Sequence, residues 1–441
     1  MSGLAEILHS KGWLVTGSDS KSSNITDHLE KLGITITIGQ RAENITDNID
    51  LVVYTAAVKP DNPELAQARD KNLTIIDRAA LLGALMKDYG CPICISGTHG
   101  KTTTTSMITE ILLAAGMDPT VSVGGFLESI HSNFRLGRSP YFVVESCEYY
   151  DSFLKFYPKI GVILNVDRDH LDYFPDLKAI EASFRRFAQN IPDDGALVIY
   201  GGITPTVSEG LACRIITYGT EDSQVTAENL LFDREGFPGF TIRDNGETIG
   251  GVRLRVRGEH NVKNALAACA AAKAAGADNE AVLTGLSRFE GAKRRFEEKG
   301  VFNGVYVVDD YAHHPTEIKA TLQAAARSGY KRIFCVFQPH TYTRTLALLD
   351  EFAHCFTDAD EVIVLDIYAA REKDTGLINA QTLTDRISAA GTHAVYCQTN
   401  EAARMYLLEH GSPGDLCITV GAGDVYLVGE NLIRGQQTIA K

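Results

Sequence analysis

The segment of the chain best suited to chemistry is a glycine-rich turn between a short apolar run and a helical pattern. The apolar run at residues 93–96 predicts a buried strand, and Lys101 stands where the helix begins. In such a turn, glycine lets backbone N–H groups approach anionic oxygens, the helix N-terminus adds positive charge, and lysine reaches the terminal phosphates. The turn is a shortened variant of G-x-x-x-x-G-K-[ST], since Ile95 stands where the first glycine is expected. We therefore predict a phosphate-binding loop formed by Gly97, Thr98, His99, Gly100, Lys101, Thr102 and Thr103.

Acidic side chains follow another predicted strand and offer ligands for a metal ion. Glu145 and Glu148 stand at and just past the end of a strand predicted over residues 141–145. Carboxylates at that point can hold Mg²⁺ opposite the phosphate loop. The hydroxyl of Thr102, which directly follows the lysine, is placed to bind the same kind of ion. A solvated acidic loop is the alternative interpretation of the two glutamates.

A second polar segment, residues 165–172, contains His170 between two aspartates and comes directly after an apolar strand. Polar residues at this density at a strand end indicate a ligand-binding edge of a parallel sheet. His170 can coordinate a second cation or pair with a carboxylate. A single histidine is more often structural, but the Asp-His-x-Asp context favours a functional role.

Two later segments place polar side chains at further element ends. Asn261 and Asn264 lie at i and i+3 of a predicted helix, so their amides share one face and can hydrogen-bond a planar base. A simple helix cap is the alternative for this segment. Arg295 belongs to a basic pair that can contact a transferring phosphate, and the cluster at residues 309–315 can orient an amine.

The composition bounds the class of protein that positions these residues. A chain of 441 residues suggests roughly three domains, at about 150 residues per domain. The formal net charge of -14 disfavours nucleic acid as the main partner. No apolar run reaches the ~18 residues of a membrane-spanning helix, and the first residues lack a secretory signal, so we expect a cytoplasmic protein without membrane insertion. The nine cysteines fit reduced thiols, and Cys91 and Cys94 are interpreted as packing residues rather than a metal site.

Short apolar runs alternate with helical periods, and this pattern predicts an α/β protein with parallel sheets covered by helices. The polar turn at residues 87–90 indicates a first boundary, which gives domains at residues 1–87, 88–296 and 297–441. In the first domain, Asp19 and Thr55 follow predicted strands and would lie along the edge where such sheets bind ligands. Strands are predicted at residues 13–17, 35–38, 51–54, 160–166, 305–308, 332–337, 361–365 and 416–420. Helices are predicted at residues 3–11, 25–32, 62–71, 78–86, 261–275, 317–328, 346–356 and 383–390.

Read together, these motifs resemble those of the Mur ligases, in order along nearly the whole chain. The resemblance is carried by residues 97–102, 165–172, 258–264, 309–317, 338–345 and 366–370. The segments Asp-Asp-Tyr-Ala-His-His-Pro-Thr-Glu and Gln-Pro-His-x-Tyr-x-Arg-Thr are similar to those of the alanine-adding member of the family. The resemblance implies three domains: a Rossmann-like N-terminal domain lacking its first strand, a central P-loop ATPase domain with a mainly parallel sheet, and a Rossmann-like C-terminal domain.

The resemblance further implies an ATP-dependent amide-forming reaction of cell-wall precursor synthesis, with UDP-N-acetylmuramate and L-alanine as substrates and Mg²⁺ as cofactor. The sugar carboxylate would attack the γ-phosphate of ATP, and the amine would then attack the acyl phosphate. The implied roles are phosphate stabilisation by Lys101, metal binding by Thr102, Glu148 and His170, adenine contact by Asn261 and Asn264, nucleotide contact by Arg295 and Asp310, and L-alanine contact by His313, His314 and Arg344.

Three departures from the family pattern bear on these expectations. The chain begins inside what resembles the family's first helix, so we expect that an N-terminal segment of the gene product, with a strand and a glycine-rich loop, is missing. Thr341 occupies a position where many relatives carry arginine, so recognition of the amino-acid carboxylate would rest on Arg344. The acidic run at residues 145–151 leaves Glu148 as the expected metal ligand, with Glu145 as the alternative.

Two other functions fit the same motifs. A murein-peptide ligase would attach a recycled tripeptide to the same UDP sugar and share most of these residues. A non-catalytic nucleotide-binding partner is the second alternative, which the intact set of phosphoryl-transfer residues disfavours. A monomer or a homodimer is expected.

Overall fold

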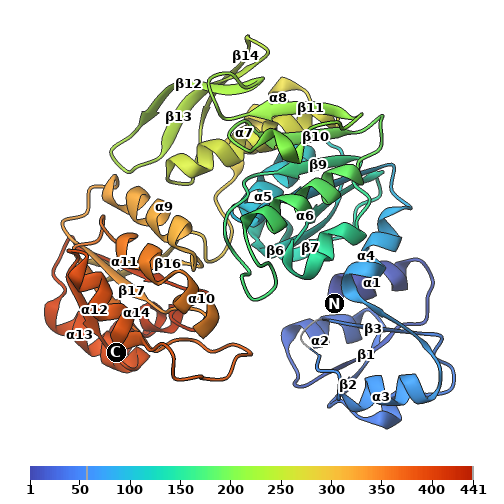
Figure 1. Ribbon diagram of the computed structural model, residues 1–441, viewed down its shortest axis with the longest axis horizontal. Coiled ribbons are helices and arrows are strands. Elements are labelled where there is room, and N and C mark those ends of the chain that lie inside the picture. The colour runs from blue at the N-terminus through green and yellow to red at the C-terminus, as the bar shows by residue number, and fades with distance from the viewer. Residues whose placement is uncertain (56–57, 440–441) are drawn as a thin grey trace.

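The computed structural model describes residues 1–55 and 58–439 and divides the chain into three lobes (Figure 1). The N-terminal lobe holds two separate pairs of parallel strands, β1 with β2 and β3 with β4, each joined by a helical connection. Its elements are α1 (Ser2–Ser10), β1 (Thr16–Asp19), α2 (Asn24–Lys31), β2 (Thr35–Ile38), β3 (Leu51–Tyr54), α3 (Pro63–Asp70), β4 (Thr74–Asp77) and α4 (Arg78–Met86).

The central lobe is built on a ten-stranded sheet in the order β14-β13-β12-β11-β10-β9-β5-β8-β6-β7. Strands from β11 to β6 in this order run parallel, while the β12 to β14 end and the β6–β7 end are antiparallel. Its strands are β5 (Cys91–Ser96), β6 (Thr120–Leu127), β7 (Ser132–Arg135), β8 (Tyr141–Glu145), β9 (Ile160–Ile163), β10 (Ala196–Tyr200), β11 (Arg214–Tyr218), β12 (Val225–Phe232), β13 (Pro238–Asp244) and β14 (Glu247–Arg253). Its helices are α5 (Lys101–Ala114), α6 (Leu177–Gln189), α7 (Glu259–Ala274) and α8 (Asn279–Arg288).

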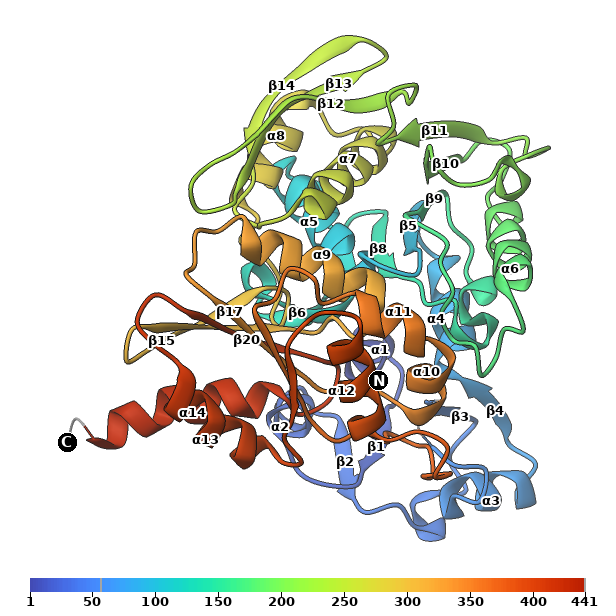
Figure 2. The same cartoon turned by 60° about the vertical axis from the view of Figure 1, so that its left-hand side comes forward.

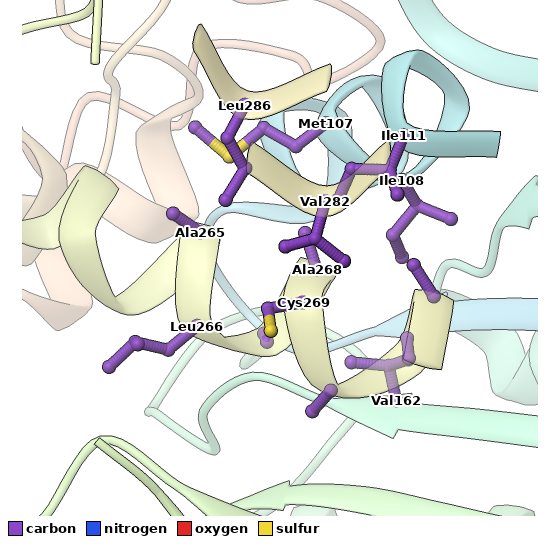
Figure 3. Packing of buried hydrophobic residues seen from close by; sticks show 14 of the residues in the cluster. Met107, Ile108, Ile111, Val162, Ala265, Leu266, Ala268, Cys269, Val282 and Leu286 are labelled. Atoms are coloured by element: carbon purple, nitrogen blue, oxygen red, sulfur yellow. The ribbon is translucent and has the colours of Figure 1, made fainter. Parts of the chain in front are cut away.

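Helices α5, α7 and α8 pack on one face of this sheet and share its largest buried apolar cluster (Figure 3). Small side chains let the helices approach closely: α7 is rich in alanine, and a side chain at Gly285 of α8 would lie 2.5 Å from the Cα atom of Ile111 on α5. This packing fixes the N-termini of α5 and α7 beside each other, which is where the predicted phosphate loop and asparagine pair lie.

The C-terminal lobe carries a six-stranded sheet in the order β15-β16-β20-β17-β18-β19, parallel except for β15. Buried apolar clusters cover both of its faces. Its strands are β15 (Glu297–Phe302), β16 (Val305–Asp310), β17 (Ile333–Phe337), β18 (Glu361–Val364), β19 (Ala394–Tyr396) and β20 (Leu416–Val420). Its helices are α9 (Pro315–Ala326), α10 (Tyr342–Ala347), α11 (Leu349–His354), α12 (Ala380–Ala389), α13 (Asn400–His410) and α14 (Tyr426–Ile439). Figure 2 shows α9 lying between the C-terminal sheet and the central lobe.

The α/β class and the three-part organisation agree with the expectation from sequence, whereas one predicted helix and one predicted strand differ from it. The single helix predicted over residues 346–356 is two short helices, α10 and α11, which meet at Leu348. The strand predicted at residues 13–17 lies at Thr16–Asp19, with Trp13 and Leu14 exposed before it. Within residues 1–55 and 58–439, the search for a helix long and apolar enough to cross a membrane found none.

Candidate active site

The predicted phosphate loop lies between β5 and α5, at the carboxyl edge of the central sheet. Gly97 and Gly100 both have positive φ, 138° and 82°, which side-chain-bearing residues rarely adopt. Their surroundings also exclude a side chain, because a Cβ at Gly97 would lie 2.8 Å from Leu164 and one at Gly100 would lie 2.6 Å from the Asn264 amide oxygen. The loop therefore packs closely against the end of β9 and the start of α7. The N-terminus of α5 faces the space on the other side of the loop.

Lys101, the first residue of α5, turns back across the loop. Its Nζ donates to the carbonyl oxygen of Thr98 at 3.0 Å and lies 3.0 Å from a carboxylate oxygen of Glu148. Burial alone would lower the pKa of Lys101, but the Glu148 carboxylate outweighs burial and raises the pKa above its ordinary value. The lysine is therefore a permanent positive charge at the mouth of the loop.

The predicted metal ligands form two groups, each around one of two neighbouring carboxylates. The Thr102 hydroxyl donates to Glu145 at 2.8 Å, and the Gly124 backbone N–H donates to the same carboxylate oxygen at 2.7 Å. Glu148 is 2% exposed and its other oxygen lies 3.9 Å from Nε2 of His170. The structure thus brings Thr102 to Glu145, and His170 to Glu148, on the two sides of Lys101.

His170 is held by its backbone and by an aromatic neighbour. Its φ of 52° is left-handed, and its ring stacks on Tyr149 of the 3₁₀-helix η3 (Tyr149–Lys155), with ring centroids 4.3 Å apart. The Tyr149 hydroxyl donates to Asp172. Burial lowers the pKa of His170, with the neighbouring carboxylates of Asp169 and Glu148 opposing it. A neutral imidazole of this kind is the form that binds metal ions.

His99 of the phosphate loop joins the central lobe to the C-terminal lobe. Its backbone exchanges hydrogen bonds with the Asn165 amide, and its ring nitrogens lie 3.2 Å from Asp167 and 3.2 Å from Glu317 of α9. Burial alone would lower the pKa of His99, but the bonds to Asp167 and Glu317 outweigh it and raise the pKa to about 9. The phosphate loop is therefore tied by charge to a helix of another lobe.

His314 and Asp167 complete this junction. Nε2 of His314 lies 2.9 Å from the Arg168 carbonyl, and its Nδ1 accepts from the Thr316 N–H, so both ring nitrogens are engaged. Among the described residues, His99, Asp167 and His314 form the group whose possible metal-ligand atoms lie within 4.8 Å of one another. Because Asp167 also accepts from the Thr316 hydroxyl at 2.7 Å, this group forms a hydrogen-bonded network between lobes.

A cavity of about 350 Å³ opens beside the phosphate loop, between α7, α9 and the residues that link the two lobes. Asn261 and Asn264 line it from the first two turns of α7, where the Asn264 amide donates to the Asn261 amide oxygen at 2.9 Å. Arg295 lines the opposite wall, with its guanidinium 4.0 Å from Glu317 and over the Tyr311 ring. Amides, a guanidinium and aromatic rings in one cavity suit a nucleotide.

Asp310, at the end of β16, is buried and fixes the segments that join the central lobe to the C-terminal lobe. Its carboxylate accepts from the backbone N–H groups of Phe296 and Ala312 at 2.8 and 2.7 Å. Burial raises the pKa of Asp310 to about 6, against the lowering effect of Arg295. By fixing the backbone of Phe296, the carboxylate also fixes the position of the neighbouring Arg295 on the cavity wall.

On the far side of His170, the C-terminal lobe contributes His313, His340 and Arg344. The Arg344 guanidinium donates two hydrogen bonds to one oxygen of Asp169, at 3.0 and 2.9 Å, and a third to Nδ1 of His340 at 3.0 Å. Asp169 and Arg344 are 8% and 11% exposed, so this ion pair is buried between the lobes. The predicted amino-acid site thus lies directly against the segment that carries His170.

The remaining predicted residues lie in the N-terminal lobe. Asp19 ends β1 and its carbonyl accepts from Gly39, while Thr55 directly follows β3. Both figures place β1 and β3 away from α5, so the structure does not bring Asp19 and Thr55 to the phosphate loop (Figures 1 and 2). The neighbouring Ala56 and Ala57, part of the same predicted ligand edge, lie outside the described residues.

Asp167, Asp169, Glu317 and His340 belong to this site but were not among the predicted site residues. Glu317, which meets His99, Arg295 and His313, was seen only as part of a family motif. Asp169 was passed over although it flanks His170, and no sequence signal pairs it with Arg344, which lies 175 residues further along the chain. His340, which precedes α10, was seen only as part of the family motif at residues 338–345.

The fold and site are those of a three-lobed protein with a phosphate-type loop beside a cavity that suits a nucleotide. Family models match along the chain: "Mur ligase family, catalytic domain" at residues 1–90, "Mur ligase middle domain" at residues 95–272, and "Mur ligase, glutamate ligase domain" at residues 294–423. The chain belongs to the Mur ligase family, whose members use ATP.

Individual relatives narrow the comparison within the family. The chain is 51% identical to the UDP-N-acetylmuramate–L-alanine ligase of Acetivibrio thermocellus, over 100% of this chain and 94% of that protein. It is 48% identical to the enzyme of the same name from Clostridium botulinum, over 98% and 95%. Among solved structures, a UDP-N-acetylmuramate–alanine ligase of Thermotoga maritima matches with a TM-score of 0.82 and 30% identity, over 99% and 96%. A murein peptide ligase of Psychrobacter arcticus matches with a TM-score of 0.70 and 27% identity, over 98% and 96%.

Proposed function

We propose that this protein is an ATP-dependent ligase that joins L-alanine to the carboxylate of UDP-N-acetylmuramate, giving UDP-N-acetylmuramoyl-L-alanine, ADP and phosphate in peptidoglycan precursor synthesis. The observation that carries this proposal is the 51% identity, over the whole chain, to a relative of that name. The nucleotide cavity and the phosphate loop supply a position for ATP, and the cluster of His313, His340 and Arg344 supplies one for L-alanine.

The chemistry requires positioning and charge neutralisation rather than a covalent nucleophile. The sugar carboxylate attacks the γ-phosphate of ATP, and the resulting acyl phosphate is attacked by the amine through a tetrahedral intermediate. Lys101 stabilises charge on the transferring phosphoryl group, because it is held protonated at the loop. Arg295, placed on the cavity wall by Asp310, contacts the nucleotide from the C-terminal side.

The donor atoms around Lys101 fit Mg²⁺. The Thr102 hydroxyl and the carboxylates of Glu145 and Glu148 are the hard oxygen ligands that this ion prefers, and His170 adds a neutral nitrogen beside Glu148. A bound Mg²⁺ neutralises charge on the phosphates and polarises the phosphoryl oxygens. We propose Thr102 and Glu145 as one set of ligands, and Glu148 with His170 as the other.

The other reactants are assigned to the surrounding lobes. Asn261 and Asn264 contact the adenine in the cavity, and Asp19 and Thr55 belong to the N-terminal domain that binds the UDP sugar. His313 and Arg344 lie around L-alanine, while His314 stabilises the junction between lobes. We propose residues 1–87, 88–296 and 297–441 as the three domains, with a closing motion that completes the site.

The test is release of phosphate from ATP with UDP-N-acetylmuramate and each acceptor supplied separately. Release that requires both the UDP sugar and L-alanine, with mass-spectrometric detection of the UDP-N-acetylmuramoyl-L-alanine product, is the expected result. Release with the tripeptide L-alanyl-γ-D-glutamyl-meso-diaminopimelate and not with L-alanine would assign a murein peptide ligase instead. Nucleotide binding without any release would identify a non-catalytic binding protein.

A further inference from the structure

Two histidines at the amino-acid side of the site have their tautomers fixed by their hydrogen-bond partners. Nδ1 of His313 lies 3.0 Å from the Tyr311 carbonyl oxygen and 3.5 Å from the Glu317 carboxylate. Both partners accept only, so Nδ1 must carry the proton. In the neutral ring, Nε2 of His313 is then a lone pair, and it makes no hydrogen bond to any residue that the structure describes.

His340 has the opposite arrangement. Its Nδ1 lies 3.0 Å from an Arg344 guanidinium nitrogen, which can only donate, so Nδ1 must be the lone pair. In the neutral ring, Nε2 of His340 is therefore an N–H donor. The two rings meet edge to face, with centroids 5.7 Å apart, so the ring that carries the free acceptor and the ring that carries the donor are neighbours.

Both rings are neutral at physiological pH. Burial lowers the pKa of His313 to about 4, with Glu317 and Asp169 opposing it and Arg344 adding to it. Burial lowers the pKa of His340 to about 4, with the neighbouring His313 and Arg344 adding to it. The lone pair of His313 is thus free of a proton before the reaction begins.

Glu317 supports a positive charge that forms later on His313. Its side chain is 12% exposed, and its carboxylate also accepts from the His313 backbone N–H at 3.1 Å. The carboxyl group stays ionised because the hydrogen bond and charge of His99, together with the charge of Arg295, oppose burial and hold its pKa well below the ordinary value. Nδ1 of His313 is hydrogen-bonded to the Tyr311 carbonyl oxygen with the Glu317 carboxylate 3.5 Å away, and an acceptor with a nearby negative charge stabilises a proton gained by a catalytic histidine.

We propose that His313, oriented by Glu317, is the proton acceptor for the amine of the incoming amino acid, and that the Nε2–H of His340 faces an anionic oxygen of the same reactants. This assignment rests on the proposed ligase activity. The amine lone pair forms the C–N bond to the acyl carbon, and one N–H proton passes to Nε2 of His313. The C–O bond to phosphate breaks, phosphate leaves with the electron pair, and His313 then returns its proton to phosphate or water.

The orientation of the amino acid follows from the same tautomers. A carboxylate is repelled by the lone pair of His313 and attracted by the Nε2–H of His340 and by Arg344. The amine therefore lies toward His313 and the carboxylate toward His340.

The test separates the two half-reactions in the full-length protein. Scrambling of ¹⁸O in β,γ-bridge-labelled ATP, with the UDP sugar and no amino acid, reports acyl phosphate formation alone. In His313→Gln, we expect this exchange to stay within a few-fold of wild type while amide formation with L-alanine falls by about a hundredfold, the usual range for a lost general base. The matched control is His354→Gln, an exposed histidine of α11 in the same lobe, which should change neither rate.

A second variant keeps the proposal testable if glutamine disturbs the fold. In His313→Ala, added imidazole should restore part of the amide-forming rate, because a free base can occupy the vacated space, whereas a purely structural loss is not restored. Wild-type amide formation in His313→Gln, or parallel loss of exchange and amide formation without rescue, would overturn the assignment. Failure of the wild-type protein to form the L-alanine product would instead contradict the proposed ligase activity itself.

Discussion

Lys101 is the single residue at which charge, loop geometry and metal ligands meet. Its ammonium group lies between the phosphate loop and Glu148, and no other lysine forms part of the loop. Because phosphoryl transfer depends on charge neutralisation, loss of this group should affect turnover far more than binding of a sugar nucleotide in the N-terminal lobe.

Replacement Lys101→Ala is expected to lower phosphate release by on the order of a thousandfold or more, the range seen when a transition-state cation is removed. Titration calorimetry with UDP-N-acetylmuramate should give a dissociation constant close to that of wild type. The half-buried Lys273, whose amino group contacts Asn279, supplies the control Lys273→Ala. Loss of sugar-nucleotide binding in Lys101→Ala alone would contradict separate sites.

The raised pKa of His99 predicts a pH dependence of stability. A group whose pKa is higher in the folded than in the unfolded state stabilises fully below its unfolded value, and this stabilisation is lost as pH rises through the folded value. For His99 the window runs from about 6.5 to about 9, and a shift of this size corresponds to about 3 kcal/mol at most. Thermal melts from pH 6 to 9.5 should show wild type losing stability across this window, and His99→Gln should flatten the curve. Equal slopes for the two proteins would contradict the ion pairs with Asp167 and Glu317.

At the scale of elements, the approach of α8 to α5 decides how the phosphate loop is supported. Gly285→Ala adds one methyl group that would lie 2.5 Å from Ile111 Cα and 2.6 Å from its backbone nitrogen, atoms that cannot move independently of α5. We expect a loss of about 1–3 kcal/mol in the free energy of unfolding, as for other over-packed cores.

The control for Gly285→Ala is a helical glycine in open space. Gly435 of α14 has no heavy atom within 4 Å of a built Cβ, so Gly435→Ala should stabilise by about 0.4–1 kcal/mol through the unfolded state. Chemical denaturation of the two variants should therefore give changes of opposite sign. A stabilised Gly285→Ala would show that α5 and α8 are not in contact at this point.

Elements with strong periodicity could be predicted from the sequence, and elements set by tertiary contacts could not. The strands at residues 35–38, 51–54, 141–145 and 416–420 and the helix at residues 78–86 have the predicted bounds, because each is a short apolar run or a regular helical period. Strand β15 was missed, since its charged, largely exposed sequence carries no apolar alternation and its position is set by pairing with β16 and by contact with α14. The break between α10 and α11 at Leu348 was also missed. The start of α10 is set by a tertiary hydrogen bond from the Thr341 N–H to the Tyr368 carbonyl oxygen, which the sequence pattern does not show.

The residues of the site also divide into those that could be predicted from the sequence and those that are set by tertiary contacts. Lys101 and Thr102 could be predicted because the loop that positions them is continuous in sequence. The partners of His99 and Arg344 could not, because Glu317 and Asp169 reach them only after two lobes have folded and met. Local spacing carries no information on contacts of this kind.

At the scale of the whole molecule, two ion pairs cross the same boundary between the central and C-terminal lobes with different burial. Arg344 with Asp169 is nearly enclosed, whereas Arg168 with Glu351 is 51% and 44% exposed. Exposed pairs contribute about 0–1 kcal/mol, and removing one partner of a buried pair costs about 3–5 kcal/mol.

Asp169→Asn should therefore loosen the docking of the C-terminal lobe, with a larger radius of gyration by small-angle X-ray scattering and a lower melting temperature. Arg168→Gln, adjacent in sequence and in contact with the same lobe, should leave both quantities near those of wild type. An Asp169→Asn protein as compact and as stable as Arg168→Gln would show that the buried pair does not hold the lobes together.

The position of Glu317 has a consequence for how such an enzyme can diversify. One carboxylate contacts His99 of the phosphate loop, Arg295 of the cavity wall and His313 of the amino-acid side. Any mutation at Glu317 therefore changes its contacts with the phosphate loop, the cavity wall and the amino-acid side at once. Selection for a new amino-acid acceptor cannot act on one of these contacts alone. Descendants with a different amino-acid preference have to arise through residues such as Thr341 and Tyr368, which border the acceptor side and leave the phosphate loop untouched. A compound that binds to this carboxylate is difficult to resist by mutation of Glu317, because the mutation also removes the other contacts of the carboxylate.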